Sequence, residues 1–173
     1  MTAGSACARM AGMSHIPINH PLRPLYRTAA GIVGGFTLVF GIRGFLASRG
    51  LDFFQQDDLP WVMWLRANPA FSLLSILAGA VLLLANLVGR NVAHWVNLGA
   101  GVMFTVAGLV MLALLNTNAN FLGFSMVNCI MSFVFGLITL AAGLYGRVGS
   151  QEEKENVQES RRNDADREAT AAS

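Results

Sequence analysis

Residues 123–146 read GFSMVNCIMSFVFGLITLAAGLYG, twenty-four positions without a charged side chain, and Arg147 follows them. As a helix rising about 1.5 Å per residue, this stretch reaches roughly 36 Å, which is enough to cross a hydrocarbon core of about 30 Å with some tilt. The glycine and the basic residue at its end are typical of a helix C-terminus. The stretch therefore predicts a membrane-spanning helix.

The composition of the whole chain agrees with a membrane protein. Of its 173 residues 54% are hydrophobic and 13% are charged, about half the charged share of a soluble domain. Between Leu73 and Gly146 the only charged side chain is Arg90, whereas residues 147–173 hold twelve of the twenty-two charges. The net charge of +2 and the lack of a basic patch with interleaved aromatics do not favour nucleic-acid binding. Cys7 and Cys129 lie in a polar tail and an apolar span, so we expect free thiols.

Three further apolar segments predict spans at about 28–48, 69–88 and 92–115. Asn68 before Pro69 is a strong helix start, since the first can cap and the second suits the first helical position. The short turn at residues 89–91 forces the second and third spans into an antiparallel hairpin. We predict an all-α polytopic membrane protein, a transmembrane domain over 28–147 with four transmembrane helices in an antiparallel bundle.

The segments outside this domain are expected to be flexible. Residues 1–27 are polar and interrupted by prolines, and residues 148–173 are charged and lack aromatics, so neither can bury a core. A fluctuating helix in the C-terminal tail, and a docking role for it, are the alternatives. A cleavable signal peptide is disfavoured because the first apolar run begins near residue 28 rather than near the N-terminus.

The loop over residues 50–68 is expected to be an amphipathic segment in the membrane interface. Asp57 or Asp58 can cap a short helix that tolerates Pro60 in its first turn. Trp61, Trp64 and Leu65 then share one face by helical spacing. Such a face favours either an aromatic belt at headgroup depth or a binding surface for a partner or a lipid. Tyr26 and Trp95 are predicted to be interfacial anchors as well as Trp61 and Trp64.

The basic residues indicate the orientation. The two tails and the turn at Arg90 carry more Lys and Arg in their short flanks than the loop over 50–68, which also holds Asp52, Asp57 and Asp58. By the positive-inside rule, both termini are expected in the cytoplasm and the protein in the plasma membrane.

A few polar side chains inside the spans suggest contacts between helices. Arg43 lies five residues from the end of the first predicted span and Asn128 five residues from the start of the last, so the two could meet at one depth. Asn86 and Asn97 fall at a second, inner depth. Such hydrogen bonds typically contribute about 0.6 kcal/mol and at most about 2 kcal/mol. Alternatively, Arg43 extends its guanidinium to the interface. In the first span, Gly31, Gly34 and Gly35 form a small-residue face, and Gly31 and Gly35 have the spacing of a close helix contact.

The chain resembles a bacterial family of small four-span membrane proteins catalogued only as a domain of unknown function. The resemblance covers roughly residues 19–147 and rests on HPLRPLYR at 20–27 with Ala30-Gly31, on LGFSMVN at 122–128, on FGL at 135–137 and on AGLYG at 142–146. It implies a fold and a membrane location but no activity. Members of the family often carry an Asn-x-x-His pattern early in the last span. This chain has Ser132 near that place, so no role that needs the histidine is carried over.

Three classes of function stay open. We expect a non-enzymatic scaffold or regulatory membrane component that contacts the lipid bilayer and either a second copy of itself or another membrane protein. A small oligomeric channel or transporter is the alternative, although no span has an ionisable residue or a proline near its middle, as transport sites usually do. An intramembrane enzyme is the third class, but we identify no catalytic residues. His15, His20 and His94 lack ligand spacing, so we expect no metal and no cofactor.

Overall fold

The computed structural model describes residues 23–146 and, in the C-terminal tail, residues 158–160, 162, 163, 165, 167 and 170. Its four long helices are α2 (Arg23–Ala47), α3 (Pro69–Val88), α4 (Arg90–Leu114) and α5 (Met126–Leu144). All four are long and apolar enough to cross a membrane. The predicted all-α architecture with four spans is therefore confirmed.

Predictions for the tails fall mostly outside these residues. Of the flexible tail predicted over 1–27, residues 1–22 lie outside the described part of the chain. Most of the tail predicted over 148–173 lies outside it as well. The described residues of the C-terminal tail are helical and exposed.

Helix α2 begins earlier than predicted. Residues 23–27 were expected to belong to the tail because of their prolines, yet the helix starts at Arg23. Pro24 is compatible with this start because amide groups in the first turn of a helix have no intrahelical acceptor. Tyr26 and Arg27 consequently project from a helix and not from a tail.

Helix α3 starts as predicted. The Asn68 side chain accepts a hydrogen bond from the amide of Phe71, and Pro69 occupies the first turn. The helix ends at Val88, and Gly89, with φ of 74°, connects it directly to α4. This positive φ favours glycine because a Cβ would be strained there.

Helix α5 begins at Met126, three residues later than predicted, with Ser125 as its cap. The preceding Gly123 has φ of 62°, which interrupts helical geometry. Leu122 and Phe124 on either side of it are buried. The chain therefore packs two apolar side chains inward before the helix starts.

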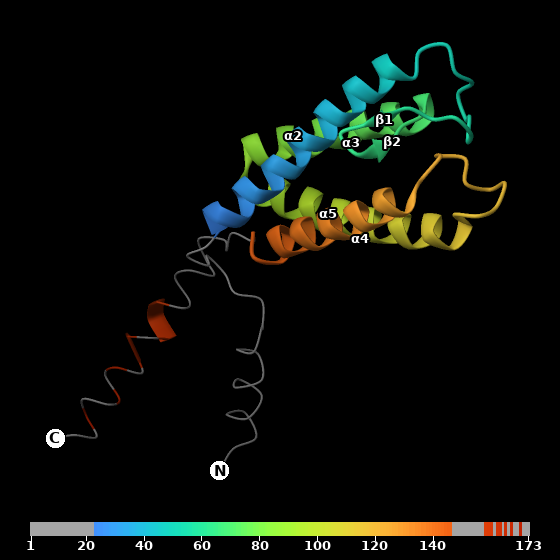
Figure 1. Cartoon of the computed structure of the whole chain (residues 1–173). Helices are drawn as coiled ribbons and strands as arrows, with labels where there is room; N and C mark the ends of the chain where they lie inside the picture. Colours follow the sequence, from blue (N-terminus) through green and yellow to red (C-terminus); the bar gives the residue numbers. More distant parts are fainter. Residues whose placement is uncertain are drawn as a thin grey trace.

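The helices form two hairpins, α2 with α3 and α4 with α5, as Figure 1 shows. Contacts within each hairpin are far more extensive than contacts between the hairpins. The second and third spans, α3 and α4, were predicted to form a hairpin across their short turn, but each packs mainly on its other neighbour, α3 on α2 and α4 on α5. We call the end where α2 begins and α5 ends the terminal end. The opposite end, with the connections over 48–68 and 115–125, is the loop end.

Glycines allow close packing within each hairpin. A Cβ on Gly79 of α3 would collide with the backbone of Leu38 in α2, and one on Gly41 would lie 2.6 Å from the amide nitrogen of Ile76. The α4–α5 contact is similar, since a Cβ on Gly143 would lie 2.7 Å from the amide nitrogen of Leu98. Of the glycines predicted to form a small-residue face on the first span, Gly34 makes a close contact, since a Cβ there would lie 2.9 Å from the amide nitrogen of Leu83 in α3. Gly35 does not take part in the packing of α2 on α3, because a Cβ there would meet nothing within 4 Å.

The loop between α2 and α3 contains a β-hairpin where a short helix was predicted. Strands β1 (Trp61–Val62) and β2 (Leu65–Arg66) pair antiparallel, with Val62 opposite Leu65. Met63 and Trp64 form the turn, with φ of 50° and 66°, as two-residue hairpin turns require. The helical spacing of Trp61, Trp64 and Leu65 was misleading, because Leu65 is buried and both tryptophans are exposed.

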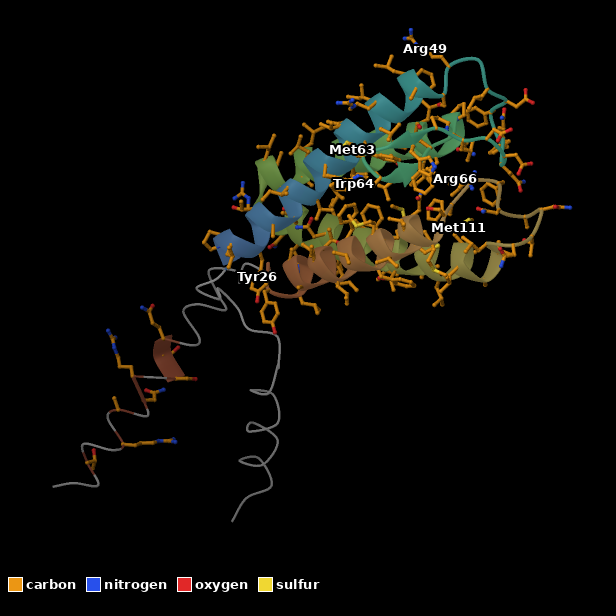
Figure 2. All side chains as sticks on the ribbon, viewed as in Figure 1. Tyr26, Arg49, Met63, Trp64, Arg66 and Met111 are labelled. Atoms are coloured by element: carbon orange, nitrogen blue, oxygen red, sulfur yellow. The ribbon has the colours of Figure 1, made fainter. Side chains whose placement is uncertain are left out.

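This β-hairpin folds back between α2 and α5 (Figure 1). Val62 and Leu65 pack with Phe40 of α2, and Met63 packs against the same cluster. Phe40 lies seven residues before the end of α2, or roughly 10 Å along a helix. Figure 2 accordingly shows Met63 and Trp64 nearer the middle of the bundle than Arg49. We call this hairpin the re-entrant wedge, because it turns back toward the middle of the bundle and packs between α2 and α5.

Candidate functional site

The structure brings Asn86 and Asn97 together near the terminal end. Asn86 Nδ2 donates to Asn97 Oδ1 over 2.8 Å, and Asn97 Nδ2 donates to Asn86 Oδ1 over 2.9 Å. Asn86 also donates to the carbonyl oxygen of Leu82, one turn back in its helix. Both side chains are buried. The reciprocal pair joins α3 to α4 where only Gly89 links them covalently.

Three further contacts connect the other neighbouring helices at this end. Arg27 of α2 donates from Nε to the carbonyl oxygen of Asn86 over 2.6 Å and from Nη2 to that of Leu87 over 2.9 Å. His94 Nδ1 of α4 lies 2.6 Å from the carbonyl oxygen of Gly143 in α5. Because a carbonyl oxygen only accepts, Nδ1 carries the hydrogen. The rings of Tyr145 and Tyr26 stack with centroids 5.0 Å apart. This contact connects the end of α5 to α2.

These contacts close a circuit from α2 to α3, α4, α5 and back to α2, which we call the terminal ring. Its members are Tyr26, Arg27, Asn86, His94, Asn97, Gly143 and Tyr145. Arg27 also lies over the carbonyl end of α3, where a cation is favourable because of the helix dipole. The terminal ring holds the two hairpins together at the end where they approach each other.

The predicted pairing of Arg43 with Asn128 is wrong. Asn128 Oδ1 accepts from the amide of Arg66 over 3.0 Å, and Asn128 Nδ2 donates to the carbonyl oxygen of Arg66 over 2.9 Å. Ser125 also donates to Asn128 Oδ1. A carboxamide carries the same donor and acceptor as a backbone peptide. The Asn128 side chain therefore makes the two hydrogen bonds with the outer edge of β2 that a neighbouring strand would otherwise make.

Arg43 lies on the exposed side of α2. It is four residues from the end of the helix, roughly 6 Å in depth. A long side chain at that depth can reach the interface while its methylene groups stay among the lipid chains. Of the two predicted alternatives for Arg43, the exposed position fits the guanidinium that extends to the interface.

Two other buried asparagines hold the connections at the loop end, Asn68 between the two connections and Asn120 within the second. Asn68 donates to the carbonyl oxygens of Gln55 and Phe121, both over 3.0 Å. Asn120 accepts from the amide of Phe124 and donates to its carbonyl oxygen. The bond from Asn68 to Phe121 ties the two connections to each other, whereas Asn120 closes a turn within the second connection. Both side chains satisfy backbone groups that could not be left unpaired in an apolar setting.

A cavity of about 70 Å³ lies between these polar layers, lined by residues of all four helices and of β2. Six of the lining residues are phenylalanines: Phe36, Phe40, Phe71, Phe104, Phe124 and Phe135. The hydroxyls of Thr37, Ser75 and Ser132 in the lining each donate to a carbonyl oxygen of their own helix. The centre of the bundle thus presents an apolar surface. Among the described residues, no three His, Cys, Asp or Glu side chains could together hold a metal ion.

The predicted aromatic anchors lie at different places. Trp61 and Trp64 are exposed on the β-hairpin, with Trp64 87% exposed. Trp95 is exposed near the start of α4 and contacts the ring of His94. Tyr26 lies at the terminal end, far from Arg49 in Figure 2, where it stacks on Tyr145 and belongs to the terminal ring.

Sequence reasoning missed the roles of Arg27, His94, Asn68 and Asn120. Asn68 was predicted only as a helix cap, although it also bonds to Gln55 and Phe121. Arg27 was assigned to the tail and its orientation signal, because Pro24 concealed the true start of α2. The sequence did carry one signal for an earlier helix start: Arg27 lies three positions after Pro24 and just before the apolar run, as expected if the proline occupies the first turn.

Comparison with known proteins gives one finding about relationship. The family model described as a domain of unknown function (DUF4383) matches residues 27–145, which include the four spans almost completely and most of the terminal ring. No curated protein and no solved structure gave a match.

Proposed function

We propose that this chain, which belongs to the DUF4383 family, is a non-enzymatic component of a plasma-membrane assembly, a scaffold or regulatory subunit with both termini in the cytoplasm. The observation that carries the proposal is how the buried polar groups are used. Asn68, Asn86, Asn97, Asn120 and Asn128 bond to one another or to backbone groups.

A helix bundle whose buried asparagines bond to one another or to its own backbone suits association with a partner better than passage of a solute. The polar contacts lie near the two ends, and the cavity between them is lined mainly by phenylalanine and other apolar side chains. An ion crossing the centre of one bundle would lose its hydration with nothing comparable in exchange. Interactions with another membrane protein would instead take place on the outer faces of the helices.

The outer face of α4 is the surface that we assign to this contact. α4 has the smallest buried share of the four spans. Trp95, Val102, Val106 and Leu109 are exposed at helical spacing. Gly99 lies among them, and a Cβ added to it would meet nothing within 4 Å. A glycine on an outward face allows the backbone of another helix to approach closely.

The proposal is tested by affinity purification of the full chain from its native membranes in a mild detergent. We expect a membrane protein to copurify at fixed stoichiometry, and Gly99→Leu to reduce its yield about tenfold. Gly35→Leu is the matched control, because Gly35 also faces open space but on α2. A chain without residues 148–173 measures what the tail contributes to the same contact.

The alternative, a small oligomeric channel or transporter, predicts a different result. The purified species would then be a homo-oligomer without a stoichiometric partner, and it would conduct ions in liposomes. That combination would overturn the subunit proposal.

A further inference from the structure

A groove at the terminal end lies between α2 and α3, separate from the central cavity. It has a volume of about 510 Å³ and is lined by five residues of α2 and three of α3. The α2 residues are Pro24, Arg27, Thr28, Gly31 and Ile32, which share one face of the helix by their spacing. Pro24 and Arg27 are therefore nearest the start of α2, and Gly31 lies roughly 6 Å deeper than Arg27.

Arg27 brings a cation to the shallow part of the groove. Nε and Nη2 donate to carbonyl oxygens of α3, while Nη1 has no acceptor among the described residues. In residues 23–146 the aspartates, Asp52, Asp57 and Asp58, all lie in the connection at the loop end. The groove thus favours an anion.

The deeper part of the groove is apolar and open. A Cβ on Gly31 would have only Asn86 Cβ near it, at 4.0 Å, so the missing side chain leaves a channel between the two helices. Ile32 and Leu87 border it and are both mostly exposed. A hydrocarbon chain can lie along this channel without displacing a side chain.

We propose that the groove binds an anionic phospholipid from the leaflet at the terminal end. Its phosphate would accept from Arg27 Nη1, and one acyl chain would lie over Gly31 between Ile32 and Leu87. The order of the groove, cation near the surface and apolar channel beneath it, matches the order of headgroup and chain in a lipid. Basic pockets between transmembrane helices recognise anionic headgroups in this way.

The test uses the full chain purified in detergent and native mass spectrometry. Phosphatidylglycerol is compared with phosphatidylcholine carrying identical acyl chains. We expect about tenfold tighter binding of phosphatidylglycerol, a loss of this preference in Arg27→Gln, and weaker binding of the lipid in Gly31→Leu, which fills the channel and leaves Arg27 in place. Arg43→Gln and Gly35→Leu are controls that should bind as the wild type does.

Equal binding of the two lipids by the wild-type chain would overturn the proposal, whatever the stability of the variants. Wild-type binding by Gly31→Leu would also overturn it. Inorganic phosphate distinguishes the two sources of the anion. If phosphate alone raises the melting temperature as much as phosphatidylglycerol does, the site takes a free anion and the assignment to a lipid is wrong.

Discussion

Asn128 allows an irregular segment to enter the apolar part of the bundle. Its carboxamide pairs with both the N–H and the C=O of Arg66, so the edge of β2 has a partner away from water. Unpaired backbone groups in hydrocarbon cost several kcal/mol each. One side chain on α5 therefore stabilises the re-entrant wedge, in addition to the packing of the wedge on Phe40.

Asn128→Ala is expected to lower the free energy of unfolding by about 1 to 3 kcal/mol, because it leaves two backbone groups of Arg66 without partners. Reversible unfolding in mixed micelles measures the change. Asn116→Ala, at an exposed position of the other connection, is the control and should change stability by less than about 0.5 kcal/mol. Equal effects of the two substitutions would contradict the role given to Asn128.

The Asn86–Asn97 pair offers a second test at the level of residues. A double-mutant cycle with Asn86→Ala and Asn97→Ala should give a coupling free energy of about 0.6 to 2 kcal/mol, since each single substitution already removes both hydrogen bonds. The same unfolding measurement provides the four values. Additive effects would mean that the two side chains do not hold α3 to α4.

At the scale of elements, glycine positions determine how closely the helices of a hairpin approach. Gly79→Ala places a Cβ against the backbone of Leu38, and the separation of α2 and α3 that it forces should cost about 1 to 3 kcal/mol. Gly35→Ala adds the same methyl group where nothing lies within 4 Å. If both variants unfold at the same denaturant concentration, the close packing of α2 on α3 is wrong.

The re-entrant wedge predicts where Trp64 lies in a bilayer. In a variant with Trp61 and Trp95 replaced by phenylalanine, Trp64 is the only tryptophan. Since it is exposed at the tip of a hairpin that packs at the depth of Phe40, lipids with brominated acyl chains should quench its fluorescence strongly. Iodide in the water should quench it weakly, and the opposite result would place the hairpin outside the membrane.

Sequence patterns predicted the helices and not the segments between them. Long uncharged stretches bounded by Asn68-Pro69 and by glycines have few alternatives in a membrane, so α3 was predicted to the residue. The spacing of Trp61, Trp64 and Leu65 is compatible with one face of a helix as well as with the β-hairpin that is observed. The hairpin that they form is stabilised at its edge by Asn128, sixty-two positions from Arg66, and local sequence carries no sign of this contact.

The same reason explains which site residues were predicted. Asn86 and Asn97 lie eleven positions apart on two helices joined by one glycine, so depth alone brings them together. Arg43 and Asn128 also lie at similar depths, yet Arg43 is on the exposed side of α2. Depth does not determine which side of a helix meets a partner. The rotation of each helix about its own axis determines that, and it depends on glycine contacts such as those of Gly41 and Gly79.

At the scale of the whole molecule, the terminal ring and the joined connections hold the four helices at both ends around an apolar centre. We propose that the chain works by association with a partner and not by conducting solutes. The most direct measurement is ion flux into liposomes that contain the purified chain at increasing ratios of protein to lipid. We predict flux equal to that of protein-free liposomes at every ratio, and flux that rises with the amount of protein would contradict the account.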